Sequence, residues 1–83
     1  MLLPLTQNQE KVFMAFFDFY LKNNYPPTQI EVAMAVGKAM VSNEVQALKK
    51  KGWLSTIQGV GRRNTTPSDE SMKKYQQNQL KFG

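Results

Sequence analysis

Cysteine and histidine are both absent from the chain. Without cysteine, neither a disulfide framework nor a cysteine-ligated zinc site can form. Without histidine, the usual general base and the other common metal ligand are missing. Only six carboxylates are present, and Ser42 and Ser55 have no base close to them in the sequence. Because no catalytic pair or metal cluster can be assembled, we predict that the protein is not an enzyme and uses neither a metal ion nor a cofactor.

Long apolar segments are missing too. Residues 1–4 carry no basic region and lead into no apolar run of signal-peptide length. Nothing approaches the roughly 20 apolar residues that a membrane-spanning helix needs. We therefore expect a soluble, cytoplasmic protein without a membrane partner. Its 83 residues suffice for one small domain with a modest core.

The positive charge of the chain is concentrated in one segment. Residues 38–63 hold six of the 11 cationic side chains and one acid, Glu44, so their net charge of +5 equals that of the whole chain. Clustered cations of this kind are the electrostatic footprint of a surface that binds a polyanion. The alternative is a charged, solvated surface that only keeps the protein soluble.

An amphipathic helix is predicted from about Gln7 to Lys22, with Thr6 as N-cap and Gln9 at the position that completes a capping box. Its apolar stripe, expected to be core, contains Phe13, Phe16, Phe17 and Tyr20, flanked by Val12 and Phe19. Three further apolar residues widen the stripe beyond what one small domain buries. This surplus predicts an exposed patch for a protein partner, formed by Met14, Phe19 and Leu21.

The segment from Tyr25 to Gly37 predicts the first helix of a helix-turn-helix. Thr28 can cap a helix over about Gln29–Val36, and Glu31 can complete its capping box. The prolines after Tyr25 separate this helix from the preceding one, and Gly37 can end it. We expect its buried face to be formed by Ile30, Ala33 and Met34, or Val36 one turn on.

A third helix is predicted from about Ala39 to Lys51, ending at Gly52. Its buried stripe would be Val41, Val45 and Leu48. The opposite face would present Ala39, Ser42, Asn43, Gln46 and Lys50. Asparagine and glutamine can bond adenine in the major groove, whereas lysines suit phosphates. An ordinary polar helix surface is the alternative interpretation of these residues.

The residues after the third helix predict a wing. Residues 53–57 are rich in strand formers, residues 58–63 form a glycine-punctuated turn, and residues 64–66 return as a second strand before Pro67. Arg62 and Arg63 suit the minor groove or backbone of DNA. We divide the chain into a DNA-binding domain (residues 1–67) and a polar tail (68–83). The tail would form a helix with a thin apolar face of Met72, Tyr75, Gln79 and Leu80. Three alternatives are open for it: it packs on the first helix, pairs with a second subunit, or stays disordered.

Two stretches of the sequence resemble a known family. Leu5-Thr6-x-x-Gln9-x-x-Val12-Phe13 and Tyr25-Pro26-Pro27-Thr28-x-x-Glu31-Val32-Ala33-x-x-Val36-Gly37 are similar to the winged-helix DNA-binding domain of the SOS repressor LexA. The segment from Leu48 through Lys51-Gly52-Trp53-Leu54 resembles the end of that family's recognition helix and the start of its wing. The similarity covers roughly residues 5–63. The segment between Gly37 and Leu48 is shorter than in the family, and the first helix is more apolar. These 83 residues do not include the family's Ser–Lys self-cleaving peptidase domain, so we do not expect switching by autoproteolysis.

The resemblance implies a mainly α fold, three helices plus a small β-hairpin wing, with a possible C-terminal helix. By that analogy, Thr28 and Gln29 would contact phosphates, Ser42, Asn43 and Gln46 would read bases, and the wing would reach the backbone or minor groove. The lysines would add sequence-independent affinity. The predicted DNA contacts are therefore Thr28, Gln29, Lys38, Ser42, Asn43, Gln46, Lys49, Lys50, Arg62 and Arg63.

The function predicted from these features is that of a sequence-specific transcription regulator of double-stranded DNA, a repressor of bacterial or phage origin. A module this small buries little DNA surface, so we expect a homodimer on a two-fold related site. The alternative is a winged helix that binds a host repressor or polymerase component through its first helix or its tail. The sequence does not specify the operator, the half-site spacing, the sign of regulation or an inducer.

Overall fold

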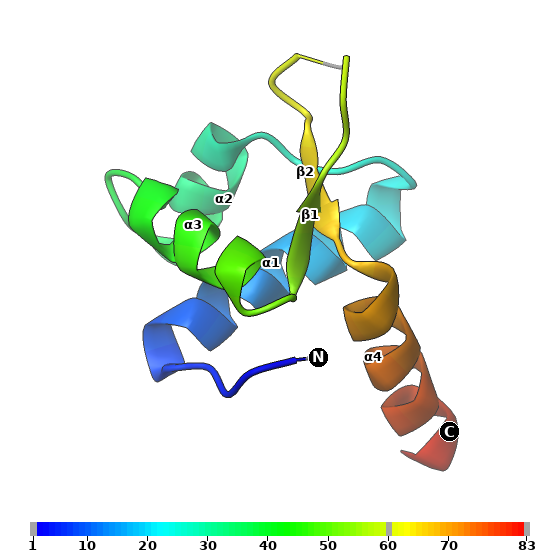
Figure 1. The fold of residues 1–83 in the computed structure, drawn as a ribbon. Coiled ribbons are helices and arrows are strands. Elements are labelled where there is room, and N and C mark those ends of the chain that lie inside the picture. Colours follow the sequence, from blue (N-terminus) through cyan, green and yellow to red (C-terminus); the bar gives the residue numbers. More distant parts are fainter. Residues whose placement is uncertain (1, 60, 83) are drawn as a thin grey trace.

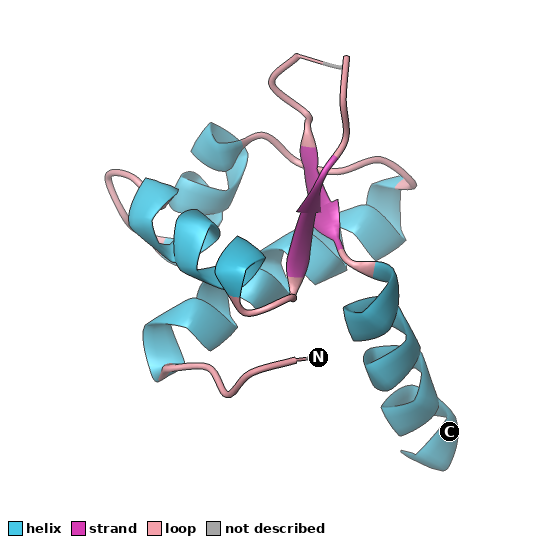
Figure 2. Ribbon diagram, viewed as in Figure 1, coloured by secondary structure: helices cyan, strands magenta, loops and turns pink. Residues whose placement is uncertain are grey.

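The structure is a computed structural model that describes residues 2–59 and 61–82, with residues 76–82 described by their backbone alone. Figures 1 and 2 show a helical body from which a two-stranded hairpin projects. The predicted mainly α, winged helix-turn-helix fold is confirmed. Its elements are α1 (Gln7–Asn23), α2 (Gln29–Val36), α3 (Ser42–Lys50), β1 (Leu54–Thr56), β2 (Thr65–Pro67) and α4 (Asp69–Phe82).

The first two helices begin at reciprocal capping boxes, as predicted. At α1, the backbone N–H of Gln9 donates to the Thr6 hydroxyl, and the Thr6 N–H donates to the Gln9 side chain, both at 3.2 Å. Thr28 and Glu31 make the equivalent pair at the start of α2. Gly37 ends α2 in the left-handed conformation (φ 74°), where the N–H of Lys38 reaches the Ala33 carbonyl at 2.9 Å. Local capping chemistry therefore sets both ends of α2.

The start of α3 differs from the prediction. The helix begins at Ser42 rather than Ala39, because residues 38–41 are needed to turn the chain after Gly37. Val41 ends this turn with its side chain in the core and its carbonyl accepting the Val45 N–H at 2.9 Å. Ala39 therefore lies in the turn and not on the outward face of the helix. At the other end, Gly52 (φ 88°) follows the helix as predicted.

The buried side chains of α1 and α3 are those that the sequence predicts, except that Tyr20 is half-buried. Around Phe13 the packing is aromatic, with ring centroids 5.2 Å from Trp53 and 5.4 Å from Tyr75. The indole N–H of Trp53 donates to the Leu3 carbonyl at 2.7 Å and so ties the N-terminal segment to the core. The core consists of Val12, Phe13, Phe16, Phe17, Val32, Ala33, Val41, Val45, Leu48, Trp53 and Leu54.

The predicted buried face of α2 is partly wrong. Val32 and Ala33 are buried and Val36 is half-buried, whereas Ile30 and Met34 are 62% and 77% exposed. This short helix carries apolar side chains on all sides, so hydrophobic periodicity does not identify which face is buried. Packing against α1 selects it instead, which leaves two large aliphatic side chains in solvent.

The wing is an antiparallel hairpin in which Leu54 pairs with Pro67, Ser55 with Thr66 and Thr56 with Thr65. The second strand was expected to end before Pro67, yet Pro67 is its last residue. Both strands of a two-stranded sheet are edges, so the N–H that proline lacks need not remove a ladder hydrogen bond.

The first turns of α4 pack on the core. The Ser71 side chain is fully buried and donates to the Trp53 carbonyl at 3.0 Å. Tyr75 lies with its ring centroid 5.0 Å from that of Phe17, and its burial raises the pKa of its hydroxyl. Of the predicted apolar face, Met72 and Tyr75 contact the core, while Gln79 and Leu80 lie outside the residues whose side chains are described. The division into residues 1–67 and 68–83 stays a prediction.

Replacing Phe13 by alanine should remove the centre of the aromatic cluster. We expect a loss of about 3–5 kcal/mol in the free energy of unfolding, because a cavity replaces a fully buried ring. Urea unfolding followed by circular dichroism measures it. Leu21→Ala, at a site 43% exposed, is the control and should change the value by less than about 0.5 kcal/mol. Equal losses in both variants would contradict the assignment of this core.

Candidate nucleic-acid interface

Three elements that are separate in the sequence form one surface. A hollow of about 240 Å³ between the start of α2 and the wing is lined by Thr28, Gln29, Ile30, Arg62 and Asn64. A neighbouring hollow of about 230 Å³ is lined by Gln29, Ile30, Ala33, Ala39, Met40, Val41 and Ser42. Since Gln29 and Ile30 line both hollows, the surface is continuous from the wing to the start of α3. We call it the α2–α3–wing surface.

The predicted base-reading residues lie on the solvent side of α3. Ser42, Asn43 and Gln46 are exposed, whereas Val45 and Leu48 on the opposite side are fully buried. Lys50 is also exposed and Lys49 is half-buried, both in the last turn of the helix. This arrangement puts small and amide side chains first and cations last, which suits contact with bases followed by contact with phosphates.

Lys38 is engaged within the protein. Its ammonium group lies 2.8 Å from a carboxylate oxygen of Glu44, which joins the turn after α2 to α3. The hydrogen bond from Lys38 lowers the pKa of the Glu44 carboxyl. Because Glu44 is the one acid between residues 38 and 63, this pair neutralises the negative charge closest to the recognition residues. The DNA contact of Lys38 stays a prediction.

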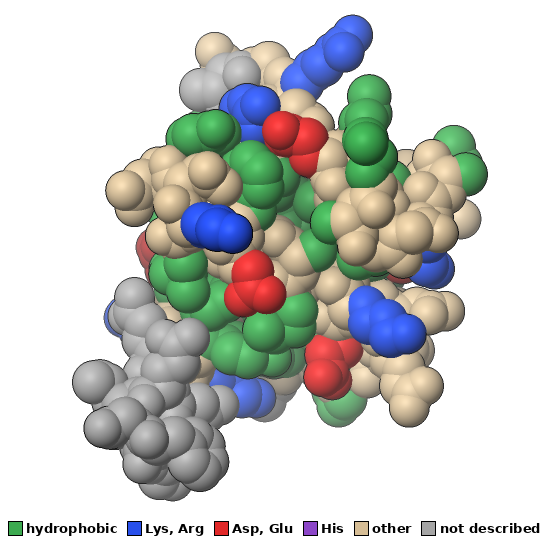
Figure 3. All heavy atoms as spheres, turned by 180° about the vertical axis from the view of Figure 1, so that it is seen from behind, with side chains coloured by type: hydrophobic (Ala, Val, Ile, Leu, Met, Phe, Trp, Pro, Cys, Tyr) green, Lys and Arg blue, Asp and Glu red, His purple; other side chains and the backbone are tan. Residues whose placement is uncertain are grey.

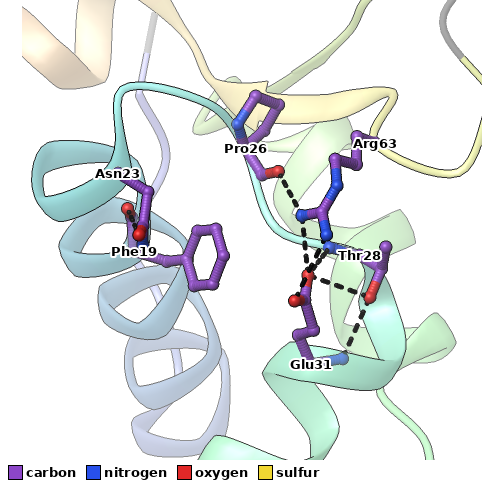
Figure 4. A network of polar contacts seen from close by, with 6 residues as sticks. All are labelled: Phe19, Asn23, Pro26, Thr28, Glu31 and Arg63. Atoms are coloured by element: carbon purple, nitrogen blue, oxygen red, sulfur yellow. Dashed lines mark hydrogen bonds and ion pairs between the residues drawn. The ribbon is translucent and has the colours of Figure 1, made fainter.

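Glu31 is the centre of a polar network at the start of α2 (Figure 4). Its carboxylate accepts the backbone N–H of Thr28 at 2.8 Å and the Thr28 hydroxyl at 3.2 Å. Arg63, from the wing, reaches the same carboxylate with both terminal nitrogens, at 2.8 and 3.3 Å. Arg63 also donates to the Pro26 carbonyl at 3.1 Å. The network joins the start of α2 to the end of the wing loop.

Aromatic rings complete the surroundings of Arg63. The guanidinium carbon lies 4.9 Å from the ring centroid of Tyr25 and 5.9 Å from that of Phe19, both within cation–π range. Phe19 and Tyr25 themselves meet edge to face at 5.6 Å. Phe19 is therefore half-buried and only partly contributes to the surplus patch that was predicted for α1.

The pairing of Arg63 with Glu31 was not predicted from the sequence. The capping-box motif indicates only that Glu31 bonds Thr28, and nothing in the chain identifies a partner 32 residues further on. The DNA contact predicted for Arg63 is untested, but its guanidinium already has protein partners. Arg62, which lines the hollow beside Thr28 and Gln29, is exposed.

A second concave region lies at the other end of α2. A groove of about 590 Å³ runs between α1 and the end of α2. Figure 3, which views the molecule from behind, shows apolar side chains gathered on this side among scattered acidic and basic ones. The groove is lined by Glu10, Lys11, Met14, Ala15, Asp18, Phe19, Lys22, Asn23, Ala35 and Val36.

The described residues form neither a membrane-spanning helix nor a metal-binding cluster. Within residues 2–59 and 61–82, no described helix is long and apolar enough to cross a membrane. Over that same part of the chain, no three histidine, cysteine, aspartate or glutamate side chains gather as metal ligands would.

The stability contributed by Glu31 should depend on pH. The N–H of Thr28 and then the Arg63 guanidinium lower its pKa below the ordinary value of 4.5. Because the pKa of Glu31 is lower in the folded state, its ionised carboxylate stabilises the fold at pH values above 4.5. This contribution to the free energy of unfolding disappears as the pH falls through the folded-state pKa. Glu31→Gln keeps an acceptor for Thr28 but removes the charge.

We therefore expect Glu31→Gln to unfold at a lower temperature than the wild type at pH 7, and we expect this difference to be smaller at pH 3. Thermal unfolding at both pH values measures this. A deficit of equal size at both would show that the charge of Glu31 contributes nothing to stability.

Comparison with known proteins gives the family. The sequence model of the LexA DNA binding domain matches residues 2–63. The match spans α1, α2, α3, β1 and the wing loop as far as Arg63, and it includes every side chain predicted to contact DNA. No curated protein sequence matches the chain. The predicted resemblance is confirmed, and the chain belongs to the LexA DNA-binding domain family.

Proposed function

We propose that this DNA-binding transcription regulator recognises a specific double-stranded sequence and acts as a repressor in the cytoplasm of a bacterium, on chromosomal or phage DNA. The observation that carries the proposal is the α2–α3–wing surface. It gathers Thr28, Gln29 and Arg62 around one hollow and places Ser42 at the edge of the next. Family membership supplies DNA as the partner, and the exposed polar face of α3 supplies the groups for sequence discrimination.

We assign different tasks to the residues of this surface. Ser42, Asn43 and Gln46 would discriminate bases, since amide side chains can make paired hydrogen bonds to adenine. Lys49, Lys50 and Arg62 would neutralise phosphates. Thr28 and Gln29, at the start of α2, would contact the backbone of the neighbouring strand. Lys38 and Arg63 would contribute mainly by holding Glu44 and Glu31, which would otherwise repel the phosphates.

A homodimer would use this surface twice. One module of this size buries only part of the DNA surface found in tight specific complexes, so two modules on two-fold related half-sites would supply the affinity. In this arrangement the proposed operator is a palindrome.

The second candidate function is binding of a protein partner, such as a host repressor or polymerase component. The groove between α1 and α2 favours it, since Met14 and Phe19 line it and Leu21, on the same helix, is 43% exposed. DNA and protein binding would use different residues of α2, near its start and at its end, so the two functions are compatible.

The proposed function is tested by fluorescence anisotropy with duplex DNA at ~50 and ~200 mM salt. One duplex has a random sequence and the other comes from a pool selected by the protein. We expect tight binding to the selected duplex, weak binding to the random one, and weaker binding of both at higher salt. Equal affinity for the two duplexes would exclude sequence-specific regulation. Absence of DNA binding at the lower salt, with saturable binding to a protein, would favour the second candidate.

Gln46→Ala should relax base preference. The amide is exposed on α3, so the fold should be unaffected, and one good base contact is worth roughly 1–3 kcal/mol of discrimination. We expect the ratio of affinities for selected and random DNA to fall roughly five-fold or more, with an unchanged salt slope. If both affinities fell equally, Gln46 would be a backbone contact.

Arg62→Ala should weaken binding to every sequence alike. Loss of one phosphate contact should make the slope of log K against log salt shallower by roughly 1. Lys73→Ala, which removes an exposed cation from α4, is the control for net charge and should leave the slope nearly unchanged. Equal slopes in the Arg62 variant and the wild type would place Arg62 outside the interface.

A further inference from the structure

Two large aliphatic side chains are exposed within the α2–α3–wing surface. Ile30 is 62% exposed and Met40 is 69% exposed. Single exposed apolar residues are common and need no explanation. These two, however, line one hollow together with Gln29 and Ser42, which are predicted DNA contacts. The hollow is therefore mainly apolar, since Ala33, Ala39 and Val41 also line it, whereas the hollow beside the wing is lined mainly by polar and cationic side chains.

The position of Met40 follows from the late start of α3. Residues 38–41 form the turn, and Val41 is directed into the core, where it is 1% exposed. Met40, its neighbour, is left in solvent directly before the first residue of the helix. In helix-turn-helix proteins, the first residues of the recognition helix approach the base edges. A side chain just ahead of Ser42 is thus close to the predicted base contacts.

The chemistry of methionine restricts what Met40 can recognise on DNA. An uncharged thioether cannot neutralise a phosphate, and it is at most a weak hydrogen-bond acceptor. In the major groove, thymine presents a 5-methyl group that apolar side chains contact. Methionine is unbranched and polarisable, so it adapts to such a surface. Among the four DNA bases, thymine is therefore the one that matches this part of the hollow.

We propose that Met40 reads a thymine of the half-site through its 5-methyl group, with Ile30 forming the other apolar wall of the hollow. This inference rests on the proposed function. It adds an apolar specificity contact to the hydrogen-bonding residues Ser42, Asn43 and Gln46. It also gives a reason for the exposure of Met40, directly before α3, and of Ile30, at the start of α2.

The test replaces each thymine of the selected duplex, one at a time, by deoxyuridine, which pairs identically and lacks only the methyl group. For the wild type we expect one substitution in each half-site to weaken binding about four-fold, as for one buried methyl group. For Met40→Ala, the thymine and deoxyuridine duplexes should bind equally. Met40→Gln, which keeps the length of the side chain, should behave in the same way.

Met34→Ala is the matched control. Met34 is also a methionine, 77% exposed on α2, but it lines neither hollow. This variant should keep the full difference between the two duplexes. Circular dichroism should show native helix content in the Met40 and Met34 variants, because both sites are solvent-exposed.

Two results would overturn the inference while leaving the proposed function intact. One is a wild type that binds its selected duplex specifically but shows no effect of deoxyuridine at any position. The other is a thymine preference that Met40→Ala and Met40→Gln retain in full. Failure of the wild type to bind any duplex would overturn the proposed function and this inference together.

Discussion

One carboxylate joins two parts of the α2–α3–wing surface, the start of α2 and the end of the wing loop. Glu31 closes the capping box of α2 with one oxygen and receives Arg63 from the wing through both. The strands of the hairpin are held by the core, where Leu54 and Thr65 are buried, whereas Gly59 and Arg62 in the wing loop are exposed. The contact of Arg63 with Glu31 attaches the end of this loop to α2, beside Thr28 and Gln29. The same ion pair neutralises the Glu31 carboxylate near the proposed phosphate contacts. One interaction therefore both positions the wing loop and removes a charge that would repel DNA.

The aromatic core behind this surface determines how α3 and the hairpin are placed. Phe13 and Phe17 on α1 meet Trp53, at the start of the wing, and Tyr75 on α4. Trp53 lies in the short connection between the end of α3 at Lys50 and the start of β1 at Leu54. Because its ring is buried in the core, it fixes the point at which α3 ends and the hairpin begins. The exposed side chains of α3 that are predicted to contact bases (Ser42, Asn43 and Gln46) can be small and polar because Val45 and Leu48 supply the packing.

Predictions from the sequence succeeded where local chemistry decides the structure. Capping residues and Gly37 gave the bounds of α2, and the heavy apolar stripe of α1 gave the core. They failed where a distant contact decides. Ile30 and Met34 were assigned to the core because α2 is apolar on all sides, and only its contact with α1 selects Val32 and Ala33. The start of α3 was set too early, since helical periodicity does not reveal how many residues the turn needs. The pairing of Arg63 with Glu31 joins residues 32 positions apart, for which no local pattern exists.

These contacts change the interpretation of the charge on the chain. From the sequence alone, the six cations between residues 38 and 63 would form one basic surface. In the structure, however, Lys38 forms an ion pair with Glu44, and Arg63 forms one with Glu31. Lys51 donates to the Gln9 side chain at 2.6 Å, toward α1. Lys49, Lys50 and Arg62 are then the main candidates for phosphate contacts. Since each neutralised phosphate contributes about 0.9 to the salt slope, three contacts would give one module only a moderate salt-dependent affinity. Two modules on one operator would double this contribution, so the internal pairing of the cations supports the proposal of a homodimer.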